Sequence, residues 1–96
     1  FKKAKKQAIK MSQNVAKDDA QALHIILKRL TRHYYNSQLA SQPLAQWSES
    51  LSKLCGDTFS YDELMPLYQQ QNNNAELAAK LRNAIHNFKL KEPINV

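Results

Sequence analysis

The sequence predicts a small all-α domain, a bundle of four or five helices. Every apolar stripe recurs with a period of three to four residues, and no segment alternates with a period of two. One glycine and three prolines among 96 residues leave few residues suited to hairpin turns or to a phosphate-binding glycine loop. The length allows one hydrophobic core. Walker-type and dinucleotide-binding functions are therefore excluded.

Residues 1–17 form a basic segment with six lysines and no acid, which accounts for the whole formal charge of +6. Residues 18–96 are electrically balanced, with eight basic and eight acidic residues. A weak apolar seam runs through the basic segment, made by Phe1, Ala4, Ala8, Met11 and Val15. This spacing predicts an amphipathic helix that is marginal alone and needs to dock or to continue another helix, with mobility near Phe1. We divide the chain into a basic helix or tail (1–17), a helical domain (18–91) and a loose C-terminus (92–96).

The strongest helix signal spans residues 19–36. Asp18 and Asp19 offer an N-cap. An apolar stripe follows at helical spacing, made by Leu23, Ile26, Leu27, Leu30 and Tyr34. A polar stretch from residue 36 to 42 then separates this helix from the next.

A third helix is expected to open after Ser41 as its cap, with Pro43 in its first turn, and to close near Cys55. Its buried face comprises Leu44, Trp47, Leu51 and Leu54. Gly56 stands where a left-handed C-cap is favoured. We expect Trp47 to be largely buried, with Leu27 and Leu51 nearby.

A short fourth helix is predicted over about 61–70. Ser60 and Glu63 have capping-box spacing, Phe59 can act as a hydrophobic staple, and Pro66 predicts a kinked or partly 3₁₀ segment.

The last helix follows a polar linker over residues 69–74, with Asn73 and Glu76 as its cap. Its apolar face comprises Leu77, Leu81, Ile85 and Phe88, and its end is marked by Lys89, Lys91 and Pro93.

No catalytic or metal-binding constellation is evident. His24, His33 and His86 lack the spacing that places two ligands on one helical face, so we interpret them as surface or half-buried residues. Cys55 is the only cysteine, which excludes an intramolecular disulfide, and its apolar neighbours favour a core role over a nucleophile. Asp62 and Glu63 are adjacent, so on a helix their side chains point in different directions and cannot form a shared-proton carboxylate pair. We interpret them as capping and solvated residues. We expect no enzymatic activity, no metal and no cofactor.

Two groups of residues are candidate contact sites. One would meet a membrane surface and comprises Lys2, Lys3, Lys5, Lys6 and Lys10. The other is a possible partner contact and comprises Lys28, Arg29, Arg32 and Tyr35, of which the three cations would meet an acidic partner or a phosphate and Tyr35 is a free aromatic residue. For its three cations the alternative is an ordinary solvated helix face.

A family resemblance is carried by loose hydrophobic patterns over about residues 1–70. They comprise the run Leu23-His-Ile-Ile-Leu-Lys-Arg-Leu, the pair Tyr34-Tyr35, Trp47 with Leu51, and then Phe59, Leu64 and Tyr68. The chain resembles the C-terminal domain of a domain-of-unknown-function family of small bacterial single-span membrane proteins. That family is encoded beside MoxR-type AAA+ ATPases and von Willebrand factor A-domain proteins in Bat-type operons. Its Tyr-Pro-Arg is here Tyr35-Asn36-Ser37, and its Gly-Glu-Ala-Trp is Leu44-Ala45-Gln46-Trp47.

The resemblance implies a transmembrane helix upstream of Phe1, and a start other than Met is typical of a fragment. Lysines directly after a span indicate the cytoplasmic side of the bacterial inner membrane. We therefore expect a non-enzymatic, membrane-tethered interaction or scaffold domain. Its expected partners are MoxR-type ATPases or von Willebrand factor A-domain proteins, with anionic lipid headgroups at the lysines and no small-molecule substrate. The alternative is a small basic helical nucleic-acid-binding domain that uses the lysine segment.

Overall fold

The chain folds into six α-helices in a computed structural model that describes residues 2–69 and 74–90. They are α1 (Lys3–Gln13), α2 (Ala20–Tyr34), α3 (Ser37–Ala40), α4 (Leu44–Cys55), α5 (Tyr61–Tyr68) and α6 (Ala75–His86). No strand occurs among the described residues. The all-α prediction is confirmed, and the described part of the chain has six helices where four or five were expected.

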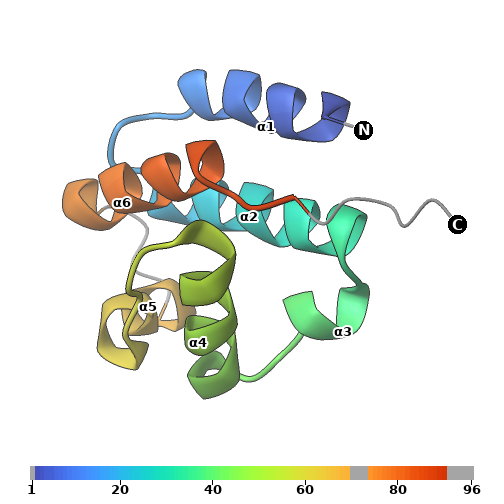
Figure 1. Cartoon of the computed structure of the whole chain (residues 1–96). Coiled ribbons are helices and arrows are strands. Elements are labelled where there is room, and N and C mark those ends of the chain that lie inside the picture. Colours follow the sequence, from blue (N-terminus) through green and yellow to red (C-terminus); the bar gives the residue numbers. More distant parts are fainter. Residues whose placement is uncertain (1, 70–73, 91–96) are drawn as a thin grey trace, which may run out of the picture.

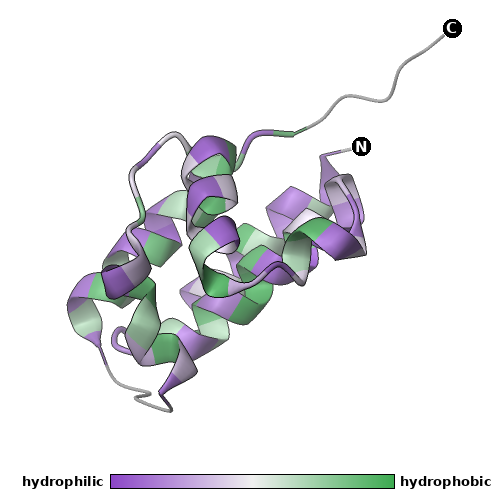
Figure 2. Cartoon of the chain, turned by 90° about the horizontal axis from the view of Figure 1, so that it is seen from below, coloured by the Kyte–Doolittle hydropathy of each residue, from purple (hydrophilic) through white to green (hydrophobic). Residues whose placement is uncertain are grey.

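The helices form three layers around α2 (Figure 1). α2 packs against α1, α3 and α6, and α1 also contacts α6. The α4–α5 pair lies on the other side of the α2–α6 layer from α1. Hydrophobic and hydrophilic residues alternate along the helices (Figure 2), and the buried hydrophobic residues form one core cluster. The central pair is thus covered on one side by α1 and on the other by α4 and α5.

Trp47 lies in the core with 0% of its surface exposed. The predicted burial of Trp47 is confirmed, and Leu27 and Leu51 belong to the same buried cluster. The largest fully buried apolar side chains come from four helices and the segment after α6: Trp47, Phe88, Leu23, Leu27, Leu51, Leu64, Leu81 and Ile85.

The additional helix is α3, in the stretch expected to be a polar connection. The Asn36 side chain accepts a hydrogen bond from the Leu39 N–H at 2.7 Å and caps this turn. Ser41 is the C-cap of α3, with its N–H donated to the Ser37 carbonyl. α4 begins after Pro43 without a cap from any described side chain. The prediction that Ser41 caps α4 is wrong because the chain completes another helical turn first.

Three predicted helix ends are confirmed. The Asp19 side chain accepts a hydrogen bond from the Ala22 N–H at the start of α2. Gly56 closes α4 in the left-handed conformation, with φ at 65°. Ser60 and Glu63 form a reciprocal capping box on α5.

Pro66 does not turn α5 into a 3₁₀ segment. The helix stays α-helical through this residue and ends at Tyr68. Proline lacks an N–H, so α5 lacks the bond that would reach the Asp62 carbonyl.

α6 begins one residue later than predicted. The Asn74 side chain accepts from the Leu77 N–H at 3.0 Å, whereas Asn73, the expected cap, lies outside the described residues. The Asn74 N–H also donates to the Asp18 carbonyl at 2.9 Å, which ties the start of α6 to the start of α2. Phe88 lies beyond the helix end yet is 1% exposed. The predictions for Phe1, Lys91, Pro93 and residues 92–96 also fall outside the described residues.

α1 packs onto the predicted helical domain. It ends at Gln13, four residues before the expected boundary, and Ala8 belongs to the core cluster. Within residues 2–69 and 74–90, no helix has the length and apolarity required to cross a bilayer.

Candidate functional site

Four of the five lysines predicted to meet a membrane are exposed on α1 or directly before it: Lys2, Lys3, Lys6 and Lys10. Residues three and four apart share a helix face, so Lys3, Lys6 and Lys10 lie on one side of α1. Their ammonium groups make no hydrogen bond or ion pair with the described residues. We call these four residues the lysine face.

Lys5 points toward the domain instead. Its Nζ donates to the Phe88 carbonyl at 2.9 Å, and its backbone N–H donates to the Tyr34 hydroxyl at 3.2 Å. First-turn N–H groups lack acceptors within a helix, and no described side chain caps α1 at Lys2. The Tyr34 hydroxyl supplies one missing acceptor. Lys5 therefore belongs to the docking contact of α1, and its predicted membrane role is revised.

Arg82 of α6 holds the other end of α1. Its Nε donates to the Ser12 carbonyl at 3.3 Å, and its Nη2 lies 3.1 Å from the Val15 carbonyl and 3.4 Å from the Ala16 carbonyl. Ser12 is in the last turn of α1, where the carbonyls carry partial negative charge that a guanidinium offsets, and Val15 and Ala16 follow the helix. Sequence reasoning missed Arg82, since these partners lie 66–70 residues away.

The buried side of α1 is rotated relative to the predicted seam. Ser12 is fully buried, whereas Met11 is 43% exposed. The Ser12 hydroxyl donates a hydrogen bond to the Ile9 carbonyl at 2.6 Å, so this polar group has a partner although it is buried. The prediction that Met11 lies on the buried seam is wrong. The small Ser12 occupies the buried position in the contact between α1 and α6, and Met11 lies at the edge of the buried side of α1.

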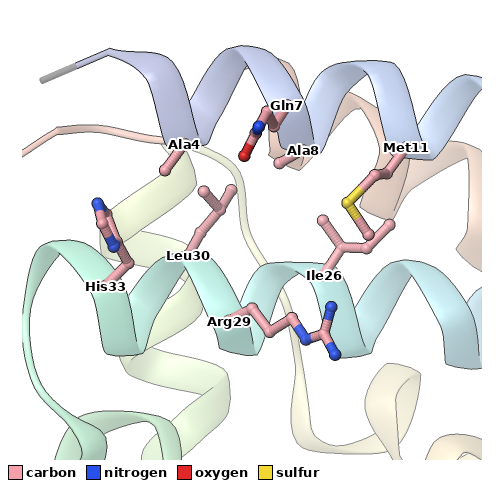
Figure 3. A pocket seen from close by; sticks show the side chains of 8 residues that line it. All are labelled: Ala4, Gln7, Ala8, Met11, Ile26, Arg29, Leu30 and His33. Carbon is pink, nitrogen blue, oxygen red and sulfur yellow. The ribbon is translucent and has the colours of Figure 1, made fainter.

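An open groove of about 240 Å³ runs between α1 and α2 (Figure 3). Its apolar lining comprises Ala4, Ala8 and Met11 from α1 with Ile26 and Leu30 from α2. Its polar lining comprises Gln7 from α1 with Arg29 and His33 from α2. The alanines of α1 leave space that larger side chains would fill. The α1–α2 groove thus combines an apolar lining with a cationic side.

The predicted cationic group on α2 is not one patch. Lys28 donates from Nζ to the Tyr68 hydroxyl at 3.2 Å and lies 5.7 Å from the Trp47 ring centroid. Arg29 lines the α1–α2 groove, and Arg32 is exposed. Lys28 is thus engaged within the bundle, and the two arginines remain as candidate contacts.

Tyr35, the predicted aromatic contact, is half-buried. Its hydroxyl donates to the Lys89 carbonyl at 2.8 Å, and its ring meets Phe88 edge-on with centroids 6.1 Å apart. Tyr35 therefore joins the end of α2 to the segment after α6.

His24 forms a buried hydrogen bond that sequence reasoning missed. It is 5% exposed, and its Nε2 accepts from the Trp47 indole N–H at 2.8 Å. Burial, followed by the nearby charge of Lys28, lowers the pKa of His24 to about 4. The prediction of a surface or half-buried residue is wrong for His24, because its neutral ring lies in the core and accepts the hydrogen bond of the buried Trp47 indole.

Cys55 is a core residue, as predicted, with 2% of its surface exposed. Burial is the main cause that raises the pKa of its thiol to about 12, so the thiolate needed for nucleophilic attack is scarce at neutral pH. Within the described ranges, no group of three His, Cys, Asp or Glu residues could hold a metal ion.

Three acidic residues lie close together away from α1. A second hollow, between α5 and α6, is lined by Asp62, Glu63 and Glu76 together with Lys80. Lys80 forms a 2.7 Å ion pair with Glu63 and lowers the pKa of that carboxyl. α5 and α1 lie on opposite sides of the α2–α6 layer (Figure 1). The lysine face on α1 and this acidic hollow between α5 and α6 are thus separate parts of the surface.

Comparison with protein-family models, curated proteins and solved structures gives no significant match.

Proposed function

We propose that this chain is a non-enzymatic protein-interaction domain whose lysine face contacts an anionic membrane surface. The observation that carries the proposal is the docked position of α1. Lys5, Tyr34 and Arg82 hold the helix on the domain, so the lysine face is a fixed part of the surface. The acidic hollow between α5 and α6 lies away from it, which favours one orientation at a negative surface.

The lysine face supplies weak, reversible attraction. At about 1 kcal/mol per lysine near an anionic surface, four lysines give about 4 kcal/mol. The Debye length is about 8 Å at physiological ionic strength, so moderate salt screens much of this attraction. An attraction of this size is weak, so a covalent tether would strengthen attachment to the membrane. The family resemblance implies such a tether, a transmembrane helix upstream of Phe1.

The same resemblance supports a place on the cytoplasmic side of the bacterial inner membrane, with a MoxR-type ATPase or a von Willebrand factor A-domain protein as partner. Co-purification of the full-length protein with such components tests the partner. Recovery of the full-length protein wholly in the soluble fraction would contradict the tether.

Vesicle co-sedimentation of the 96-residue chain tests the lysine face. The test variant carries Lys6→Gln and Lys10→Gln. The matched control carries Lys53→Gln and Lys89→Gln, the same charge change at exposed positions outside α1. Loss of two lysines from the contact corresponds to about 2 kcal/mol, or about 30-fold weaker binding to phosphatidylglycerol vesicles.

The control variant is expected to change vesicle affinity by about threefold or less. Equal effects of the two variants, or equal binding to neutral and anionic vesicles, would refute a defined membrane face. Duplex DNA serves as the competing ligand, because lysines also attract nucleic-acid phosphates. Tighter binding to duplex than to vesicles, with the same dependence on Lys6 and Lys10, would favour the nucleic-acid alternative.

A further inference from the structure

We infer that the α1–α2 groove binds an acidic amphipathic helix of a partner protein. One apolar side chain of that helix enters the groove, and its carboxylates meet Arg29 and the neighbouring cations. The inference rests on the proposed function as an interaction domain and specifies the chemistry of the partner.

The groove is small and mostly apolar. Five of its eight lining residues are apolar, and Met11 at its edge is 43% exposed. Ile25, one helical turn before Arg29, is 50% exposed and extends the apolar surface along α2. A volume of about 240 Å³ is below the ~300–1,000 Å³ typical of small-molecule pockets. The groove therefore suits a single large apolar side chain, presented by a helix whose remaining residues lie over Met11 and Ile25.

The two helices that border the groove carry charged side chains of positive sign only. Together α1 and α2 contain no Asp or Glu and seven cationic residues: Lys3, Lys5, Lys6, Lys10, Lys28, Arg29 and Arg32. The Arg29 guanidinium makes no hydrogen bond or ion pair with the described residues. Its positive charge beside an apolar groove is complementary to carboxylates beside an apolar anchor, and it disfavours a basic partner.

A lipid fits the groove less well than a helix. A hollow sized for one side chain is short for an acyl chain, and Gln7 on its α1 side offers an amide that can bond a polar group of a protein. The lysine face and the groove therefore serve different ligands, and two independent measurements can separate them.

NMR titration of the isotope-labelled 96-residue chain, without vesicles, tests the groove. The probe is a synthetic peptide of about four helical turns with leucines on one face and glutamates on the other. A peptide with lysine in place of each glutamate is its counterpart. We expect the acidic peptide to shift the methyl resonances of Met11, Ile26 and Leu30, and the basic peptide to leave them unchanged.

Two charge reversals on α2 serve as test and control. Arg29→Glu, in the groove, should weaken binding of the acidic peptide about tenfold or more, and Arg32→Glu, outside its lining, about threefold or less. Met11→Gln should also weaken binding, because it removes the apolar edge without changing the charge. Arg29→Gln provides the test if Arg29→Glu alters the amide spectrum of the free chain.

Equal losses for the Arg29 and Arg32 variants would show diffuse attraction and overturn the inference, as would shifts that avoid Met11 and Ile26. Absence of acidic-peptide binding would overturn it too. Weaker vesicle binding for Arg29→Glu, with peptide binding unchanged, would assign the groove to lipid and refute the inference. Peptide binding that persists when vesicle binding fails would support the groove and contradict only the membrane part of the proposed function.

Discussion

Acidification is expected to destabilise the fold through His24. In the folded chain His24 Nε2 accepts the Trp47 indole hydrogen bond, so a proton on this nitrogen would displace the bond. It would also place a charge in a site that is 5% exposed and near Lys28. The folded state therefore binds this proton only near pH 4, whereas the unfolded chain binds it near the ordinary pKa of 6.5.

The direction and size of the effect follow from that difference in pKa. As the pH falls below about 6.5 the unfolded state takes up the proton first, so the free energy of unfolding decreases. At about 1.4 kcal/mol per pH unit, the full loss approaches about 3 kcal/mol near the folded pKa. About 2 kcal/mol of this is lost between about pH 7 and pH 5, a large share of the stability of a small domain.

Urea unfolding at these two pH values measures the loss, with Trp47, the only tryptophan, as the fluorescent probe. His24→Gln is the matched variant, because the glutamine side chain can accept the indole hydrogen bond but does not titrate. The variant should lose much less stability between the two pH values than the natural chain. The pKa of Glu63 lies below its ordinary range, so its contribution is lost only in more acidic solution. Equal losses in the natural chain and the variant would refute the role of His24.

Three further predictions concern packing, backbone conformation and the docking of α1. Trp47→Ala removes the largest fully buried side chain and should cost about 3–5 kcal/mol in urea unfolding; an unchanged midpoint would place Trp47 outside the core. Gly56→Ala should cost about 1–2 kcal/mol from its φ of 65° alone, because the added Cβ would meet only the flexible Lys89 side chain at 3.8 Å. Gly56→Asn should cost less, since asparagine tolerates this conformation, and the reverse order would argue for a steric cause. Arg82→Ala removes hydrogen bonds worth about 1.5 kcal/mol from the end of α1, so its amides should exchange hydrogen about tenfold faster relative to those of α4. Uniform acceleration across both helices would contradict the docking role of Arg82.

The features predicted correctly from the sequence are determined by residues close together in the chain. The stripe of α2, the capping box of Ser60 and Glu63, and the left-handed Gly56 each depend on partners within a few residues. α3 was missed because its four residues carry no periodicity, and its Asn36 cap stands in a polar stretch that also suits a loop.

The candidate site was harder to predict, because distant residues determine it. Spacing alone allowed either Met11 or Ser12 on the buried side of α1, and the contacts of Arg82 decide between them. Lys5 was indistinguishable from its neighbours until Phe88 supplied an acceptor 83 residues away. The α1–α2 groove likewise exists only once the two helices are paired.

Paramagnetic broadening by a headgroup-chelated gadolinium lipid in anionic bicelles reports which face of the domain lies against the membrane. We expect strong broadening of the amides of Lys3, Lys6 and Lys10, and little for Asp62 and Glu63 of α5, on the other side of the α2–α6 layer. Strongest broadening over α5, or uniform broadening of all six helices, would contradict a membrane-facing lysine face.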